Sequence, residues 1–260
     1  MKNALITSNE KKQNQEGVVD DDFVGEGDEV EYGYFSGYEK PKEVIEQIKL
    51  LHQYFPEIGE ADEAIADLAI ADQVFPEGAE GWFAIPKWET IAPTYALAVR
   101  RVLEKLKKVL GNGLYSYCEE RIEQKYFRQS EGSIKAWTVL AEEQDGYDIL
   151  IVPAQFGINY VDCPVRRVLQ AMPPNEFGLG AFAVGIMLLT HPEERLSHCE
   201  DLWINCAGDE FSSKPDNRFD SAPYFSFFAG QVELGLEYTG ASDGYHGSSS
   251  GFLPQLNTES

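Results

Sequence analysis

The residue types best suited to catalysis lie where a strand-like segment, residues 201–206, meets a turn of small residues. This region carries one thiol and two carboxylates, on Cys206, Asp209 and Glu210. Polar groups at a strand end often line a site, because the strand fixes them while the turn exposes them. A cysteine becomes nucleophilic when a neighbouring base lowers its pKa, and His191 is a nearby candidate base. The segment therefore allows an enzyme site built from these four residues; the alternative is a buried thiol beside an acidic turn.

Four histidines and cysteines between residues 191 and 206 also suggest metal binding. Structural zinc sites usually show ligand pairs two to five residues apart, whereas here the two histidines are seven residues apart, as are the two cysteines. No phosphate-loop, dinucleotide-binding or zinc-protease motif is present. We therefore predict no metal site and no cofactor, and an alternative role for the first histidine is to end a helix. The four residues are His191, His198, Cys199 and Cys206.

Basic side chains gather on the polar face of a helix predicted over residues 93–110. Arg101, Lys105 and Lys108 follow one another at three- and four-residue spacing, so they share a helix face. They could dock an acidic partner or a phosphate; the alternative is a solvated face, or one paired with the acidic residues of this chain. Arg166 and Arg167 form a second candidate binding pair, for which structural salt bridges are the alternative.

The charge of the whole chain limits its partners. Its 260 residues carry 21 Lys and Arg against 44 Asp and Glu, a formal net charge of −23. Such a surface disfavours binding to nucleic acid and to anionic membranes, and it suits a basic partner. The alternative is that the acidic surface only keeps the protein soluble. Our leading interpretation is a soluble interaction or accessory protein that binds a basic protein; an enzyme of unidentified substrate near Cys206, Asp209 and Glu210 is the alternative.

Two observations predict a cytoplasmic location. Residues 1–12 have no apolar stretch that would make a signal peptide. Four cysteines in so long a chain, with no C-x-x-C pair, are typical of a reducing compartment. The sequence leaves the oligomeric state and any substrate open.

The order of elements predicts an α+β fold, with a helical N-terminal half packed on a C-terminal, mostly antiparallel sheet. Residues 1–38 are acidic and poor in apolar side chains, so we expect a disordered tail followed by one α+β domain over 39–260. The Gly/Ser-rich stretch 240–251 is expected to be a mobile surface loop, or one that wraps a phosphate with its backbone N–H groups. The remaining expected helices lie at 41–55, 62–69, 132–143 and 178–191, and the remaining strands at 82–85, 148–152, 223–228 and 231–238.

Several short strings of this chain are similar to bacterial proteins of unassigned function. The resemblance covers about residues 40 to 255 and implies a bacterial, cytosolic setting. It carries over no catalytic or binding residue. The strings are Pro153-Ala154-Gln155-Phe156-Gly157, Asn175-Glu176-Phe177-Gly178, Leu188-Leu189-Thr190-His191-Pro192-Glu193 and Gly251-Phe252-Leu253-Pro254-Gln255.

Overall fold

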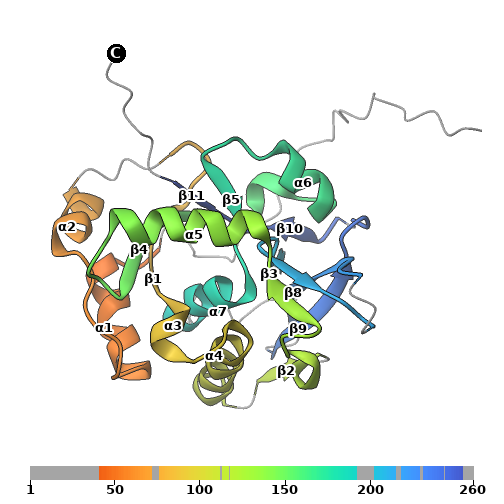
Figure 1. Cartoon of the computed structure of the whole chain (residues 1–260), viewed down its shortest axis with the longest axis horizontal. Helices are drawn as coiled ribbons and strands as arrows, with labels where there is room; N and C mark the ends of the chain where they lie inside the picture. The colour runs from red at the N-terminus through yellow and green to blue at the C-terminus, as the bar shows by residue number, and fades with distance from the viewer. Residues whose placement is uncertain are drawn as a thin grey trace, which may run out of the picture. The chain divides into compact units, whose positions relative to one another are not determined.

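Eleven strands divide between two sheets in the described residues, and seven α-helices accompany them (Figure 1). Most strand pairs are antiparallel, so the predicted α+β class is confirmed. All described residues belong to one unit, Tyr32–Ser260, and the predicted acidic tail lies outside them. The computed structural model describes residues 41–71, 76–111, 113–116, 118–191, 202–214, 218–228, 231–242 and 244–253.

The first sheet has four antiparallel strands in the order β1-β4-β11-β5. Its central strand β4 is buried along its whole length, as its continuous apolar sequence predicts. The strands are β1 (Gly81–Pro86), β4 (Ile149–Gln155), β11 (Ser250–Phe252) and β5 (Glu176–Gly178).

Two buried glutamines pair with backbone groups of this sheet where no strand does. Gln47 donates to the carbonyl of Trp82 at 2.9 Å and accepts from the N–H of Ala84 at 2.9 Å. Gln144 does the same for both backbone groups of Ile151, at 3.1 and 2.8 Å. A primary amide presents one donor and one acceptor side by side, so it replaces a neighbouring strand at one residue pair.

The second sheet has seven strands and contains both parallel pairs, β10 with β6 and β2 with β9. Its longest pair is the hairpin of β8 and β9, which confirms the predicted hairpin. The strands are β2 (Leu114–Ser116), β3 (Phe127–Gln129), β6 (Trp203–Asn205), β7 (Asp209–Phe211), β8 (Ser221–Phe228), β9 (Gln231–Tyr238) and β10 (His246–Ser248).

The prediction of a surface loop over 240–251 is wrong for residues 246–251, which form β10 and most of β11. Ser248, Ser249 and Ser250 are all buried. The N–H of Ser249 bonds Asn205 in the second sheet at 3.0 Å, and its carbonyl accepts from Leu179 at 3.1 Å. This segment passes between the two sheets, where only small side chains fit. Its sequence is therefore rich in Gly and Ser, as the sequence of a turn would be.

Five of the seven described helices lie close to the predicted positions, whereas α3 and α6 were not predicted, because four and seven residues are too few to show a helical period. Residue Thr94 caps α4, because its hydroxyl accepts from the N–H of Leu97 at 3.3 Å. The first helix begins at Val44, three residues later than Pro41, which was the expected first helical position. No described helix is long and apolar enough to cross a membrane. The helices are α1 (Val44–Tyr54), α2 (Glu63–Ala71), α3 (Trp88–Ile91), α4 (Tyr95–Val109), α5 (Glu131–Glu143), α6 (Val165–Ala171) and α7 (Ala181–Thr190).

Helix α7 is buried at all ten residues and contacts α4 and β1. Because water cannot reach its ends, the end groups must bond to protein. At the C-terminal end, the Thr190 hydroxyl donates to the carbonyls of Ile186 and Met187 at 3.1 Å. His191 Nε2 accepts from the N–H of Lys42 at 3.0 Å, so the proton lies on Nδ1, 2.9 Å from the Met187 carbonyl.

The glutamine pairing gives a test of the fold. Gln47→Leu leaves two buried backbone groups of β1, the Trp82 carbonyl and the Ala84 N–H, without the side chain that bonds them. Each such loss costs about 1–3 kcal/mol. We expect the free energy of unfolding, measured with urea, to fall by about 2–6 kcal/mol. Gln53→Leu, at an exposed position of the same helix, is the matched control. Equal stability of the two variants would show that the amide does not replace a strand.

Candidate functional site

Asp209 is a buried carboxylate that joins three elements. It opens β7 and is 2% exposed. The Tyr95 hydroxyl on α4 donates to Asp209 Oδ1 at 2.7 Å. The N–H of Ala181, the first residue of α7, donates to Oδ2 at 2.6 Å. One side chain therefore caps the buried start of α7 and also holds the first residue of α4 in place.

The close approach of these groups requires a glycine at position 180. A Cβ atom there would lie 2.3 Å from Asp209 Oδ1 and 2.4 Å from the Tyr95 hydroxyl oxygen. Both distances are far below van der Waals contact, and neither partner is at the free end of a mobile chain. The Gly178-x-Gly180 sequence is thus explained by close packing against residues 207–209 and Tyr95.

Burial raises the pKa of Asp209 to about 7. The hydrogen bonds from Ala181 and Tyr95 act in the opposite direction, because they stabilise the charged form. Burial also raises the pKa of Tyr95 well above its ordinary value, and the neighbouring Asp209 charge adds to this. The pair therefore has a carboxyl group that exchanges its proton near neutral pH, held against a tyrosine that stays protonated.

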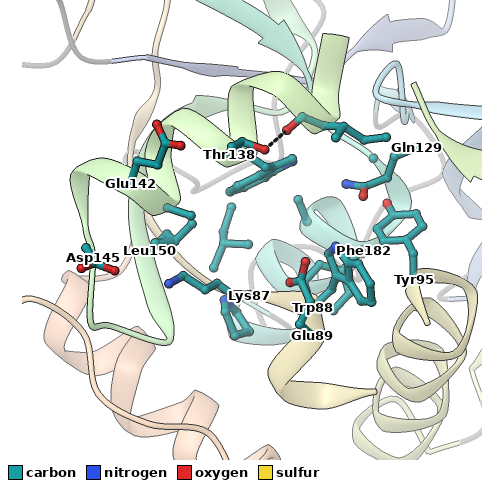
Figure 2. Close-up of a pocket in the computed structure, with 17 residues that line it drawn as sticks. Lys87, Trp88, Glu89, Tyr95, Gln129, Thr138, Glu142, Asp145, Leu150 and Phe182 are labelled. Carbon is teal, nitrogen blue, oxygen red and sulfur yellow. Dashed lines mark hydrogen bonds between the residues drawn. The ribbon is translucent and has the colours of Figure 1, made fainter. Parts of the chain in front are cut away.

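Tyr95 and Gly180 also line a cleft of about 790 Å³, which we call the α3–α5 cleft. Its volume falls in the range of small-molecule sites. One wall is α5, the opposite wall is α3, and Leu150 of the first sheet lies between them (Figure 2). Ile85 of the same sheet also lines the cleft. The lining residues are Ile85, Pro86, Lys87, Trp88, Glu89, Tyr95, Gln129, Ile134, Trp137, Thr138, Ala141, Glu142, Asp145, Leu150, Gly180, Phe182 and Ala183.

The two ends of the cleft differ in chemistry. Figure 2 shows the Tyr95 hydroxyl and the Gln129 amide close together at one end, and Glu142 and Asp145 at the other. Aromatic rings of Trp88, Trp137 and Phe182 also line the cleft. The walls of the cleft are mostly apolar. Its lining also carries three carboxylates and one lysine, so the net charge of the lining is negative.

The structure brings Cys206 and Asp209 together but leaves Cys206 sealed. The Cys206 side chain is 0% exposed, and burial raises its pKa well above the ordinary value, with the Asp209 charge adding to the effect. The thiol lies 3.9 Å from the carbonyl of Ile204. These properties are the opposite of those of a reactive cysteine, which is partly exposed and has a lowered pKa.

The other two predicted catalytic residues lie away from Asp209. His191 follows the C-terminus of α7, whereas Asp209 bonds its N-terminus, and ten helical residues rise about 15 Å. Glu210 points to the surface, where its carboxylate is 2.7 Å from Arg128 Nε. The four residues therefore do not converge on one site.

The metal hypothesis receives no support from the part of the chain that is described. Within those residues, no group of three or more His, Cys, Asp or Glu side chains could hold a metal ion. His198 and Cys199, two of the four ligands considered, lie outside the described residues.

The basic face of α4 lies outside the cleft. Arg101 donates to the Ile91 carbonyl and pairs with Glu57 at 3.3 Å, with half of each charged side chain exposed. Lys105 lies over the ring of Phe55, with Nζ 5.4 Å from the ring centroid, and Lys108 is exposed. This face is anchored partly within the protein, and such exposed pairs contribute little to stability.

The second basic pair lies on α6, and the contacts of its arginines within the described residues do not include the carboxylate of Glu176. Glu176 accepts from the Tyr160 hydroxyl at 2.7 Å and also from Ser250. Arg166 instead lies over the Tyr238 ring at 5.7 Å and reaches the Thr239 hydroxyl at 3.4 Å. Arg167 is exposed and lowers the pKa of Cys163, against the larger effect of burial.

Sequence reasoning identified Asp209 but missed the residues of the cleft. Tyr95 has the spacing of the apolar residues of α4, and no local pattern distinguishes Trp88, Trp137 or Glu142 from ordinary core or surface residues. A cleft between two helices depends on how they pack over long sequence distances, which periodicity does not report. One local pattern does indicate part of the site. Gly180 precedes a fully apolar helix and has no side chain to cap it, so the buried N–H groups at the start of that helix need an acceptor from another part of the chain.

Comparisons with protein-family models, with curated proteins and with solved structures found no match for this chain. The similarity to bacterial proteins of unassigned function stays a prediction, and function has to be argued from the site.

The pKa of Asp209 predicts a specific pH dependence of stability. An unfolded aspartate has a pKa of about 3.9, so the folded state binds the proton more tightly. This contribution to stability is complete below about pH 4 and is lost as pH rises through 7. Asp209→Asn cannot titrate, so relative to this variant the wild type should lose on the order of 4 kcal/mol over that range.

Urea unfolding at pH 4 to 8 measures this difference, and carbon NMR of the carboxyl group measures the pKa directly. Glu210→Gln, at the adjacent exposed carboxylate, is the matched control and should keep most of the wild-type pH dependence. An Asp209 titration midpoint near 4 would contradict the prediction.

Proposed function

We propose that the chain binds a basic partner in the α3–α5 cleft, through a cationic group carried on an apolar body. The single observation behind this is the composition of the cleft. It combines the exposed carboxylates of Glu89, Glu142 and Asp145 with rings of Trp88 and Trp137, and only Lys87 opposes them.

The physical chemistry of these groups favours a cation with an apolar portion. A cation over the face of a tryptophan gains about 0.5–2 kcal/mol, and apolar surface removed from water adds to this. Ile134 is 48% exposed in the cleft, so a bound apolar group would cover it. The net charge of −23 would also attract a cation from solution and speed its association.

The setting we propose is the cytoplasm, in an interaction or accessory role. Among the described cysteines, Cys163 and Cys206 are free thiols. Free thiols support a reducing compartment.

An enzyme is the second candidate, and the Tyr95–Asp209 pair is what favours it. A carboxyl group with a pKa of about 7 is suited to general acid–base catalysis at neutral pH, and Tyr95 connects it to the cleft. Cys206 and Glu210, also considered in this role, do not line the cleft.

Turnover would test this second candidate. Proton NMR of a metabolite extract should show a compound consumed by the wild type and left intact by Asp209→Asn. The substitution preserves shape but removes the proton-accepting group. Conversion by both proteins would contradict a role for Asp209, and conversion by neither would favour the binding function.

Removal of one cleft carboxylate should weaken cation binding. The probe is 2-phenylethylamine, followed by tryptophan fluorescence, and 2-phenylethanol is its neutral counterpart. Glu142→Gln should raise the dissociation constant of the amine about threefold to tenfold, as expected for losing one partly exposed charge interaction. Affinity for the alcohol should not change.

Glu143→Gln is the matched control, because this exposed neighbour on α5 does not line the cleft and its loss changes net charge equally. Equal effects of the two substitutions would mean that only overall charge attracts the amine. Equal affinity for amine and alcohol would contradict recognition of a cation.

A further inference from the structure

The geometry points to a linear polyamine as the ligand of the α3–α5 cleft, with one ammonium group at the Tyr95–Gln129 end and another at the Glu142–Asp145 end. This inference rests on the proposed function, which requires only one cation on an apolar body. It adds the number of charges on the ligand and the distance between them.

The first argument is the length of the cleft. Its lining includes Ile134 and Glu142 on the same face of α5, eight residues apart, and this corresponds to about 12 Å along the helix axis. Gln129, before the helix, and Asp145, after it, extend the lining at both ends. A compact ligand would leave part of this length empty, whereas an extended chain would occupy it.

The second argument is the negative potential at the C-terminal end of α5. Glu142 and Asp145 both line the cleft there (Figure 2). The unpaired carbonyl groups of a helix C-terminus add a partial negative charge. Lys87, on the opposite wall, offsets one of the two carboxylates. The sum remains negative and fits one ammonium group.

The third argument is the hydrogen-bonding capacity of the other end. The Tyr95 hydroxyl donates its proton to Asp209 at 2.7 Å, and its oxygen already accepts from the backbone N–H of Phe182, so one lone pair remains for another donor. The side-chain carbonyl of Gln129 is a second acceptor beside it (Figure 2). An ammonium group carries three donors and no acceptor, and it matches such a site.

The wall between the ends suits a methylene chain. Trp88, Trp137 and Leu150 present apolar surface, and the Thr138 hydroxyl donates to the Ile134 carbonyl of its own helix at 2.9 Å. Each buried methylene contributes about 0.8 kcal/mol. Glu89 lies on the α3 wall between the two ends (Figure 2), where a secondary ammonium group of a triamine would pass.

Calorimetric titration with amines of different length and charge tests this inference. Spermidine, a triamine, should bind with a stoichiometry of one and about tenfold more tightly than putrescine, a shorter diamine, or hexylamine, a monoamine. A factor of ten corresponds to about 1.4 kcal/mol, less than one charge-assisted hydrogen bond contributes.

Substitutions should act at both ends of the bound spermidine. Tyr95→Phe removes the hydroxyl at one end and Glu142→Gln the carboxylate at the other, and each should weaken spermidine binding about tenfold. Glu143→Gln should leave it unchanged. Thermal unfolding of each variant confirms that it is folded, and hexylamine should lose affinity in only one of the two cleft variants, because it has a single charged end.

The results separate this inference from the proposed function. If 2-phenylethylamine binds and Glu142→Gln weakens it, but spermidine, putrescine and hexylamine bind equally, the polyamine inference is overturned and the proposed function stands. Equal loss of spermidine affinity in Glu142→Gln and Glu143→Gln would mean diffuse attraction to an acidic surface and would also overturn it. If no amine binds, the proposed function itself fails.

Discussion

The hydrogen bonds of Asp209 connect the parts of this protein that have to meet at the cleft. Its carboxylate accepts hydrogen bonds from the N–H of Ala181, the first residue of α7, and from the hydroxyl of Tyr95, the first residue of α4. The backbone of Asp209 belongs to β7 of the second sheet. Leu179, just before α7, accepts from the N–H of Gly208 at 2.8 Å, so the chain is fixed on both sides of this contact. Since Tyr95 and Gly180 also line the cleft, the packing that buries α7 sets the shape of the cleft at its Tyr95–Gln129 end.

Side-chain amides and hydroxyls complete the backbone pairing where strands are too short. Gln47 and Gln144 bond the backbone of β1 and β4. Ser249, between β10 and β11, bonds the Asn205 carbonyl with both its N–H and its hydroxyl. An unpaired buried backbone group costs about as much as a lost hydrogen bond, so these residues maintain sheets whose strands are often only three residues long. The first sheet in turn supplies Ile85 and Leu150 to the lining of the cleft.

Local patterns predicted the longer elements, and long-range packing decided the rest. The apolar stripe of α4 and the β-branched run of β4 report burial directly, so both could be placed from sequence. The strands β10 and β11 could not, because their Gly/Ser composition reflects tight passage between two sheets rather than a turn. Asp209 was recognised as polar and at a strand end. Its partner Tyr95 lies 114 residues earlier, a separation that no periodicity reveals.

The raised pKa of Asp209 links the cleft to the proton concentration. Burial favours the neutral carboxyl group, and the two donated hydrogen bonds only partly restore the charged form. An ammonium group that donated a hydrogen bond to the Tyr95 oxygen would increase the donor strength of the hydroxyl and so favour ionised Asp209. Binding and proton release would then be coupled, and the coupling is reciprocal by thermodynamic linkage. A carboxylate that fixes α7 in place would thereby make occupancy of the α3–α5 cleft sensitive to pH near neutrality.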